Sequence, residues 1–254
     1  IVSLANAARN LASLKRRWPI KEVIICGQNL RLLDMEGVSD VFKTQLNAGQ
    51  YRLVEIGTGS QHEKVANLLY AKMPISVDIS LVRKNIAPRV KADVNRVIEA
   101  FERVDKLELV YTLQKTEEYV LAYDNNGKTI KLLPSDVEIA YKASDGYSSS
   151  ERDGVVVFVS SIRDKDLIAK GLLKDLARQL QQLRKERQYN PTDILDAAYI
   201  AGLTGEEIAR LSLMKDELTY LVRVKNVNLL EDAALNVNYK LIEIDGREFK
   251  ISIE

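Results

Sequence analysis

The sequence has little of the chemistry that catalytic and metal sites require. Of its 254 residues, one is a cysteine (Cys26) and one is a histidine (His62). A single cysteine excludes an internal disulfide and any zinc site built from several cysteines, and it is typical of a reducing compartment. Nothing in the sequence links Cys26, in an apolar stretch, to His62 in the polar segment SQHEK, so a Cys–His nucleophilic pair is not indicated.

An excess of one charge and long apolar runs are also lacking. Lysine and arginine total 37 against 36 aspartates and glutamates, so any surface for a polyanion must be local. The longest apolar runs, such as GVVVFV at 154–159, are too short to cross a bilayer. The chain has no initial methionine and opens inside an apolar helical pattern, so we expect a piece of a longer protein.

Signatures of nucleotide-dependent catalysis are missing as well. The segment IGTGSQ (56–61) lacks the Gly-Lys-Ser/Thr ending of a phosphate-binding loop, which favours a plain turn. No pair of carboxylates has a spacing that indicates acid–base work. The sequence therefore supplies no catalytic site and no metal-ligand cluster.

What is present is a globular composition, 46% hydrophobic and 29% charged, with length for one large domain or two modest ones. Pro19 should end the first helix and Gly49 the second, and Asn126-Gly127 and Asp245-Gly246 are hairpin turn signals. We expect helices at 2–15, 38–49, 60–74 (or a long connection there), 88–101, 165–189 and 205–215. We expect strands at 21–26, 51–56, 107–113, 136–143, 154–161, 193–202 and 218–224, and hairpins at 118–133 and 239–254.

This mixture predicts an α+β fold with short antiparallel sheets and one long amphipathic helix. The only break in composition is the Gly/Ser-rich stretch near 144–154, which we interpret as a link. We divide the chain into a helix with a first α/β segment (1–60), a middle α+β segment (61–150) and a C-terminal α/β segment (151–254).

Two of the expected helices have a basic polar side. In the first, Leu4, Ala8 and Leu11 share one side, while Arg9 and Asn10 lie on the other, followed by Arg16 and Arg17 if the helix continues. In the long helix, the apolar side is made by Leu173, Leu176, Leu180 and Leu183, and the opposite side by Lys174, Arg178, Gln181 and Lys185.

These basic groups have two interpretations. Cations near a helix C-terminus, as in Lys15–Arg17 and in LRKERQ (183–188), complement the helix dipole without any ligand. Arginine or lysine mixed with asparagine or glutamine also suits contact with RNA phosphates and base edges. Composition leaves both open.

The order of several motifs resembles isoleucyl-tRNA synthetases. The opening stretch, with Ala8-Arg9 and then Lys15, Arg17, Pro19 and Ile20, is similar to the place where the last helix of the anticodon-binding bundle enters the C-terminal region. LNAGQYRLVE (46–55) is similar to a following segment of the family. The run from 130 to 194 is similar to its most recognisable C-terminal stretch, through Pro134, Asp136, Val137, Gly171, Leu172, Arg178, Gln181, Leu183, Arg184 and Lys185.

The resemblance is collinear but has gaps and departures. It is poor at about 57–130, Lys170 stands where the family usually has glutamate, and NPTDIL (190–195) replaces a more usual sequence. Bacterial members often end in a four-cysteine zinc module, so a single cysteine favours the archaeal or eukaryotic-like branch.

The resemblance implies a cytoplasmic isoleucine–tRNA ligase, which uses ATP and magnesium, with this chain as its tRNA-binding C-terminal, anticodon-side region. The fragment would lack the catalytic and editing domains, hold no cofactor or metal, and have isoleucine tRNA and the rest of the synthetase as partners, with no membrane. The residues expected to contact tRNA are Arg9, Lys15, Arg16, Arg17, Lys174, Arg178, Arg184 and Lys185. The alternatives are a structural or protein-interaction module of the same enzyme and, third, a free-standing enzyme.

Overall fold

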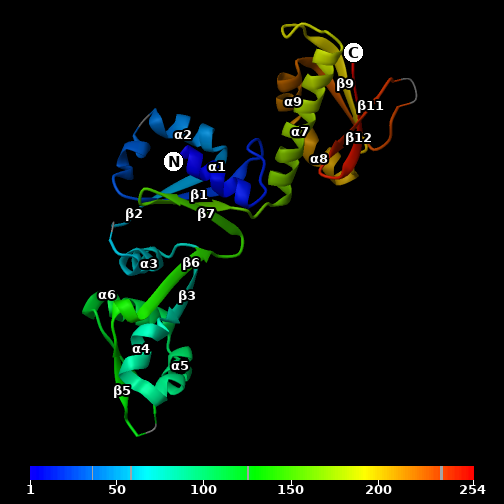
Figure 1. The fold of residues 1–254 in the computed structure, drawn as a ribbon. Coiled ribbons are helices and arrows are strands. Elements are labelled where there is room, and N and C mark those ends of the chain that lie inside the picture. Colours follow the sequence, from blue (N-terminus) through cyan, green and yellow to red (C-terminus); the bar gives the residue numbers. More distant parts are fainter. Residues whose placement is uncertain (36, 58, 125, 235–236) are drawn as a thin grey trace. The chain divides into compact units, whose positions relative to one another are not determined.

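The structure is a computed structural model that describes residues 1–254 except 36, 58, 125 and 235–236 (Figure 1). Its residues form two compact units. The first unit contains Ile1–Ser13 and Glu22–Ser161, and the second contains Leu14–Lys21 and Ile162–Glu254. Helices and strands are mixed in both units, so the α+β prediction is confirmed. The threefold division of the sequence stays a prediction.

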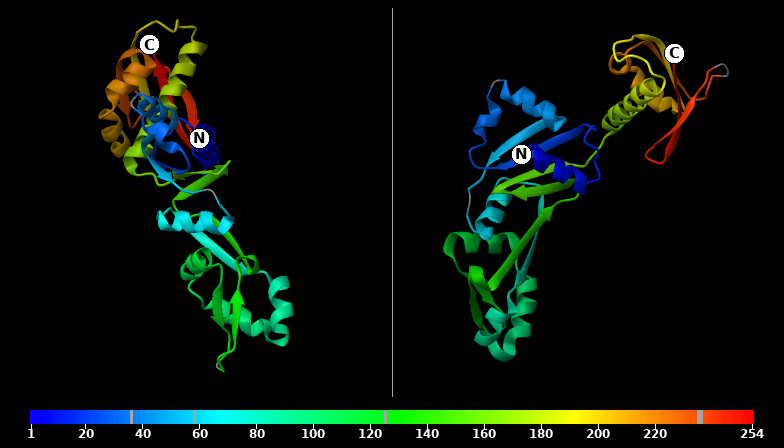
Figure 2. Two further views of the ribbon diagram at one scale, coloured as in Figure 1. Left: turned by 90° about the vertical axis from the view of Figure 1, so that its left-hand side faces the viewer. Right: turned by 45° about the horizontal axis from the view of Figure 1, so that its top comes forward.

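The first unit is built on a four-stranded sheet in the order β2-β1-β8-β7. Its strands are β1 (Ile20–Gly27), β2 (Ala48–Glu55), β7 (Tyr147–Arg152) and β8 (Val155–Ser160). Helix α1 (Val2–Leu11) lies along β7 and β8, as Figure 2 also shows. A core of Ile24, Val156 and Phe158 from the sheet joins Leu68 of α3 (Gln61–Tyr70). The 3-10 turn η1 (Leu30–Asp34) and α2 (Val38–Leu46) connect β1 to β2.

A second core of the first unit forms around a long antiparallel ribbon. The ribbon pairs β3 (Ile75–Leu81) with β6 (Val137–Ala143), in register from Ile75↔Ala143 to Leu81↔Val137. Between these strands the chain forms α4 (Arg83–Val90), η2 (Lys91–Asp93), α5 (Val94–Glu102), α6 (Lys106–Thr116), β4 (Tyr119–Ala122), β5 (Thr129–Leu132) and η3 (Pro134–Asp136).

In the described part of the second unit, helices pack on one four-stranded sheet (Figure 1). The sheet order is β10-β9-β12-β11; β10 and β9 are parallel, and the other pairs are antiparallel. The elements are α7 (Lys165–Glu186), β9 (Leu195–Ala201), α8 (Gly205–Ser212), α9 (Lys215–Val222), β10 (Val224–Leu230), β11 (Lys240–Ile244) and β12 (Arg247–Ile253).

The strongest sequence predictions are confirmed. The leucine side of α7 is fully buried, and the turn between β11 and β12 lies at Asp245-Gly246, both with positive φ as a two-residue hairpin requires. The hairpin of β4 and β5 also forms, although residue 125 beside its Asn126-Gly127 turn lies outside the described residues. A capping box at Ser60 starts α3, which decides between a helix and a long connection there.

The predicted course of the first helix is wrong in its length and its orientation. α1 ends at Leu11, well before Pro19, and Ser13 then has a φ of +56°. The buried side carries Leu4, Ala5, Ala8 and Arg9, whereas Leu11 is 74% exposed. Arg9 therefore does not share a solvent-facing side with Arg16 and Arg17.

Two predicted strands are helical. Residues 107–113 belong to α6, because the Asp105 side chain caps the amides of Leu107 and Glu108 and the helix buries Leu109 and Leu113 on one side. Residues 218–222 belong to α9, which buries Leu218 and Val222, four residues apart. A short apolar run fits the period of a helix as well as that of a strand. Here capping and tertiary packing favour the helix.

Three boundary predictions also fail. The supposed link at 144–154 contains β7, whose serine-rich backbone is paired in full with β8. Gly49 lies in β2, and the left-handed residue that closes α2 is Asn47. Pro88 lies inside α4 and does not open a helix.

We predict that Leu180→Asp destabilises the protein by at least about 3 kcal/mol, because it would place an unpaired charge in the second unit's core. Thermal or urea unfolding measures the effect. Lys170→Asp is the control, since Lys170 is exposed on the same helix and should change the unfolding free energy little. Equal stability of Leu180→Asp and the wild type would contradict the packing of α7.

Candidate nucleic-acid interface

The basic segment 14–21, which follows α1 in the chain and belongs to the second unit, binds one carboxylate on α7. Asp175, only 3% exposed, accepts hydrogen bonds from Lys15 Nζ and Trp18 Nε1, both at 3.0 Å, and forms an ion pair with Arg17. Lys15 Nζ also lies 2.6 Å from Asp245 Oδ1, in the turn between β11 and β12. The charges of Lys15 and Arg17 are therefore compensated inside the second unit.

Trp18 completes this cluster by packing over the backbone of α7. Its ring lies between two cations, with Lys15 Nζ at 4.5 Å and Arg163 Cζ at 4.1 Å from the ring centroid. A Cβ atom at Gly171 would stand 3.2 Å from Trp18 Cδ1 and 2.5 Å from Arg163 Nη2. The glycine thus lets the indole approach the helix closely. We call Lys15, Arg17, Trp18, Arg163 and Asp175 the Asp175 cluster.

The Asp175 cluster also sets the ionisation of its carboxyl group. Burial favours the neutral acid, but hydrogen bonds from Arg17, Trp18 and Lys15 and the charge of Arg17 outweigh it, so the pKa of Asp175 lies below its ordinary value. Asp175 therefore stabilises the fold above the pKa of an unfolded aspartate, about 3.9, and this contribution is lost as the pH falls through the folded pKa.

Two of the predicted contact residues are buried arginines that bind main-chain carbonyls. Arg9, 1% exposed, donates from Nη2 to Leu46 O at 2.7 Å and to Asn47 O at 3.0 Å, at the C-terminus of α2. Burial lowers the pKa of Arg9 to about 10. This guanidinium occupies a helix end where unsatisfied carbonyls favour a cation.

Arg184 has the same kind of role in the second unit. Its Nη1 donates to Val222 O at 3.0 Å and Arg223 O at 3.1 Å, and its Nη2 donates to Asn190 O at 3.0 Å and Asp193 O at 2.8 Å. One buried guanidinium therefore joins the end of α9 to the loop before β9. Arg184 positions this surface and does not itself face solvent.

The other predicted residues differ in how far their charges are compensated. Lys174 forms an ion pair with Glu217 of α9. Arg178 and Lys185 are exposed on α7, and among the residues that the structure describes neither of them forms an ion pair. Arg16 is exposed as well. On this polar side of α7, Gln181 Nε2 donates to Leu221 O at 2.8 Å, which fixes α9 against it.

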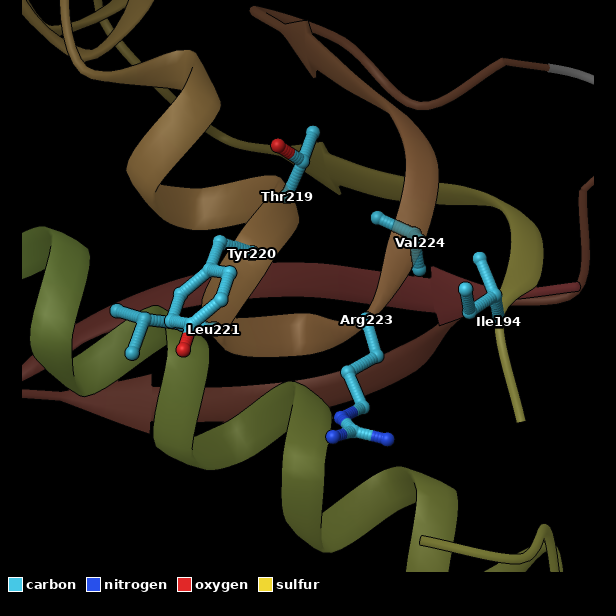
Figure 3. Close-up of a pocket in the computed structure, with 6 residues that line it drawn as sticks. All are labelled: Ile194, Thr219, Tyr220, Leu221, Arg223 and Val224. Atoms are coloured by element: carbon cyan, nitrogen blue, oxygen red, sulfur yellow. The ribbon is translucent and has the colours of Figure 1, made fainter. Parts of the chain in front are cut away.

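A surface feature that the sequence analysis missed lies beside this side of α7. A hollow of about 540 Å³ is lined by Ile194, Thr219, Tyr220, Leu221, Arg223 and Val224 (Figure 3). A smaller one of about 190 Å³ shares Leu221 and Arg223 with it and is also lined by Lys185. The sequence analysis missed these residues because it predicted a strand at 218–224. A predicted helix would have placed Tyr220 on the side opposite the buried Leu218 and Val222.

The residues considered for catalysis have structural surroundings. Cys26 is buried, with its Sγ 3.3 Å from Met73 Sδ, and burial raises the pKa of its thiol to about 12, opposite to what a nucleophile needs. In the segment 56–61, Thr58 lies outside the described residues, and Ser60 and Glu63 form the capping box of α3. Within the described part of the chain, no group of three His, Cys, Asp or Glu residues could hold a metal ion.

The search for membrane-spanning helices gives a separate finding. In the described ranges, no helix combines the length and the apolar character needed to cross a bilayer.

We predict that Asp175→Asn lowers the free energy of unfolding by about 2 kcal/mol at neutral pH, because Lys15 and Arg17 lose their charged partner. The difference from the wild type should narrow as the pH falls below about 4, because the carboxyl of the unfolded chain takes up a proton there, and should be lost as the pH falls through the lower folded pKa. Urea unfolding across this pH range measures both effects.

The matched control is Asp245→Asn. Asp245 is half exposed and forms an ion pair with Lys15, so its loss should cost less than about 1 kcal/mol. A stability gap for Asp175→Asn that stays constant down to pH 2 would show that the charge of Asp175 is not what holds the segment.

The curated proteins that this chain resembles include isoleucine–tRNA ligases. No protein-family model matches the chain. The chain is 27% identical over its whole length to 22% of the isoleucine–tRNA ligase of Thermoplasma acidophilum. It is 23% identical over its whole length to 23% of the isoleucine–tRNA ligase of Methanosarcina barkeri, and likewise to 22% of that of Clostridium novyi.

The chain thus spans about a fifth of the length of the curated relatives it matches. These matches cover every element from α1 to β12, so they concern both units and the Asp175 cluster. The chain is a distant homologue of one region of isoleucine–tRNA ligases.

Proposed function

We propose that this chain is the tRNA-binding, C-terminal and anticodon-side region of an isoleucine–tRNA ligase. The observation that carries the proposal is the match of the whole chain to one region, about a fifth, of such ligases. The parent enzyme would join isoleucine to its tRNA with ATP and magnesium. This region would hold the tRNA away from the catalytic core, with the tRNA and the rest of the enzyme as its partners.

The exposed cations of α7 support an RNA contact in the second unit. Arg178 and Lys185 lie on the side opposite the buried leucines, so folding does not depend on their charges. Each can neutralise a phosphate without first breaking an ion pair in the described part of the chain. Arg178 and Lys185 are therefore the residues that we assign to phosphate contact.

The remaining candidate residues bind groups of their own unit. Arg9 and Arg184 are committed to carbonyl oxygens, and Lys15, Arg17 and Lys174 to carboxylates. We assign them to positioning the elements that would carry RNA contacts. A phosphate that approached Lys15 or Arg17 would have to compete with Asp175.

We predict that Arg178→Ala/Lys185→Ala weakens tRNA binding and reduces the slope of log affinity against log salt by about one to two units. Unfolding should stay close to the wild type, because both side chains are exposed. Filter binding of isoleucine tRNA over a series of salt concentrations, together with urea unfolding, measures the two quantities.

The control is Arg83→Ala/Lys115→Ala, which removes the same charge from exposed positions of the first unit. It separates a local contact from the effect of net charge. Equal salt slopes for the α7 variant and the wild type would remove the phosphate assignment, and lowered stability with an unchanged slope would make the two residues structural.

The alternative is a structural or protein-interaction module of the same ligase. It is favoured by the number of predicted contact residues that bind groups inside their own unit.

We predict that deleting this region from the intact ligase impairs tRNA charging and spares isoleucine-dependent pyrophosphate exchange. Loss of both activities together would favour the structural role.

A further inference from the structure

The aromatic ring of Tyr220 is not packed in the core of the second unit. α9 turns Leu218 and Val222 into the core of the second unit, and Tyr220 lies on the other side of the helix, 81% exposed. Within the described residues its ring contacts no other aromatic ring and no cation. Ile194, on the same hollow, is 66% exposed. Large exposed apolar groups that gather at a hollow are typical of binding surfaces.

Hydrogen bonds to main-chain carbonyls hold the hollow in shape. Arg223, which ends α9, has left-handed backbone angles (φ 59°, ψ 58°), and its carbonyl accepts hydrogen bonds from Leu195 N and Arg184 Nη1, both at 3.1 Å. Arg184 also binds the carbonyls of Asn190 and Asp193, in the loop that leads to Ile194. The two walls of the hollow in Figure 3 are thus fixed to the same guanidinium, so a ligand meets a preformed surface.

The charge around the hollow favours an anion. Arg223 lines both the larger and the smaller hollow, and Lys185 lines the smaller one. None of the described residues that line either hollow is acidic. This local bias contrasts with a chain whose net charge is +1. A volume of about 540 Å³ also lies in the range of small-ligand sites, about 300–1,000 Å³.

An exposed aromatic ring on a hollow that an arginine also lines suits an unpaired nucleotide. The base stacks on an aromatic face, and the phosphate meets lysine or arginine. A duplex offers no free base face, so such a site distinguishes single-stranded from paired RNA. The ring bears no charge, so its part of the affinity does not depend on salt, in contrast to phosphate contacts.

We propose that this hollow and the smaller one that shares Arg223 with it bind one unpaired nucleotide of RNA, with its base stacked on Tyr220 in the larger hollow and its phosphate beside Arg223, toward Lys185 of the smaller one. The inference rests on the proposed function and adds to it a contact with a base. The site is sequence-tolerant on this chemistry, because every base has a face that stacks.

The test compares RNA binding by the full chain and its Tyr220 variants. The probes are a fluorescein-labelled RNA stem-loop and a fully paired RNA duplex of equal length, and fluorescence anisotropy gives the affinities. We predict that Tyr220→Ala weakens stem-loop binding by about 5- to 100-fold and leaves its salt slope unchanged. Tyr220→Phe should bind like the wild type, because the ring and not the hydroxyl is required.

Two controls separate the ring from folding and from general surface hydrophobicity. Duplex binding should be the same in Tyr220→Ala and the wild type. Leu213→Ala removes another strongly exposed apolar side chain, outside the hollow, and should not affect either RNA. Urea unfolding of Tyr220→Ala should match the wild type, since the ring is not packed.

The outcomes distinguish this inference from the proposed function. Salt-dependent RNA binding by the wild type that Tyr220→Ala leaves unchanged would overturn the stacking site alone. No RNA binding by the wild type would overturn both. A change in oligomeric state of Tyr220→Ala, measured by sedimentation, would make the hollow an interface between copies of this chain and would also overturn the inference.

Discussion

One buried carboxylate among three donors joins the segment 14–21 to the rest of the second unit. Asp175 lies on α7, and its partners Lys15, Arg17 and Trp18 come from a segment about 160 residues earlier in the chain. Removing such a carboxylate from water is costly unless its acceptor positions are filled, so the fold requires the earlier segment to be in place. This is the physical reason that residues 14–21 belong to the second unit, while their neighbours on both sides belong to the first.

Buried arginines bind main-chain carbonyls in both units. Arg9 binds two carbonyls at the end of α2, and Arg184 binds four around the end of α9. A planar guanidinium has five N–H donors in a fixed geometry and stays charged at neutral pH, so it can satisfy carbonyls from two elements at once. These two guanidinium groups are therefore committed to the fold and not to a ligand.

Placement within the fold, more than residue type, therefore separates the candidate contact residues. Arg178 and Arg184 lie six residues apart on α7, yet one is exposed and the other is buried against α9 and the loop before β9. The same contacts that bury Arg184 shape the hollow at Tyr220 and Arg223. The proposed RNA surface thus combines exposed cations on one helix with an exposed ring on the next, and a buried cation holds the second helix in place.

Local signals in the sequence are sufficient to predict some of the elements. The leucine side of α7, the Asp245-Gly246 turn and the apolar strand β8 each follow from spacing or turn chemistry within a few residues. Two other elements depend on tertiary contacts. The serine-rich strand β7 forms because its backbone pairs with β8. Residues 218–222 are helical although their short apolar run fits the period of a strand as well as that of a helix. Tertiary structure also determines which cations have a carboxylate partner. Lys15 and its partner Asp175 are 160 residues apart, and no local sequence pattern predicts such a pair.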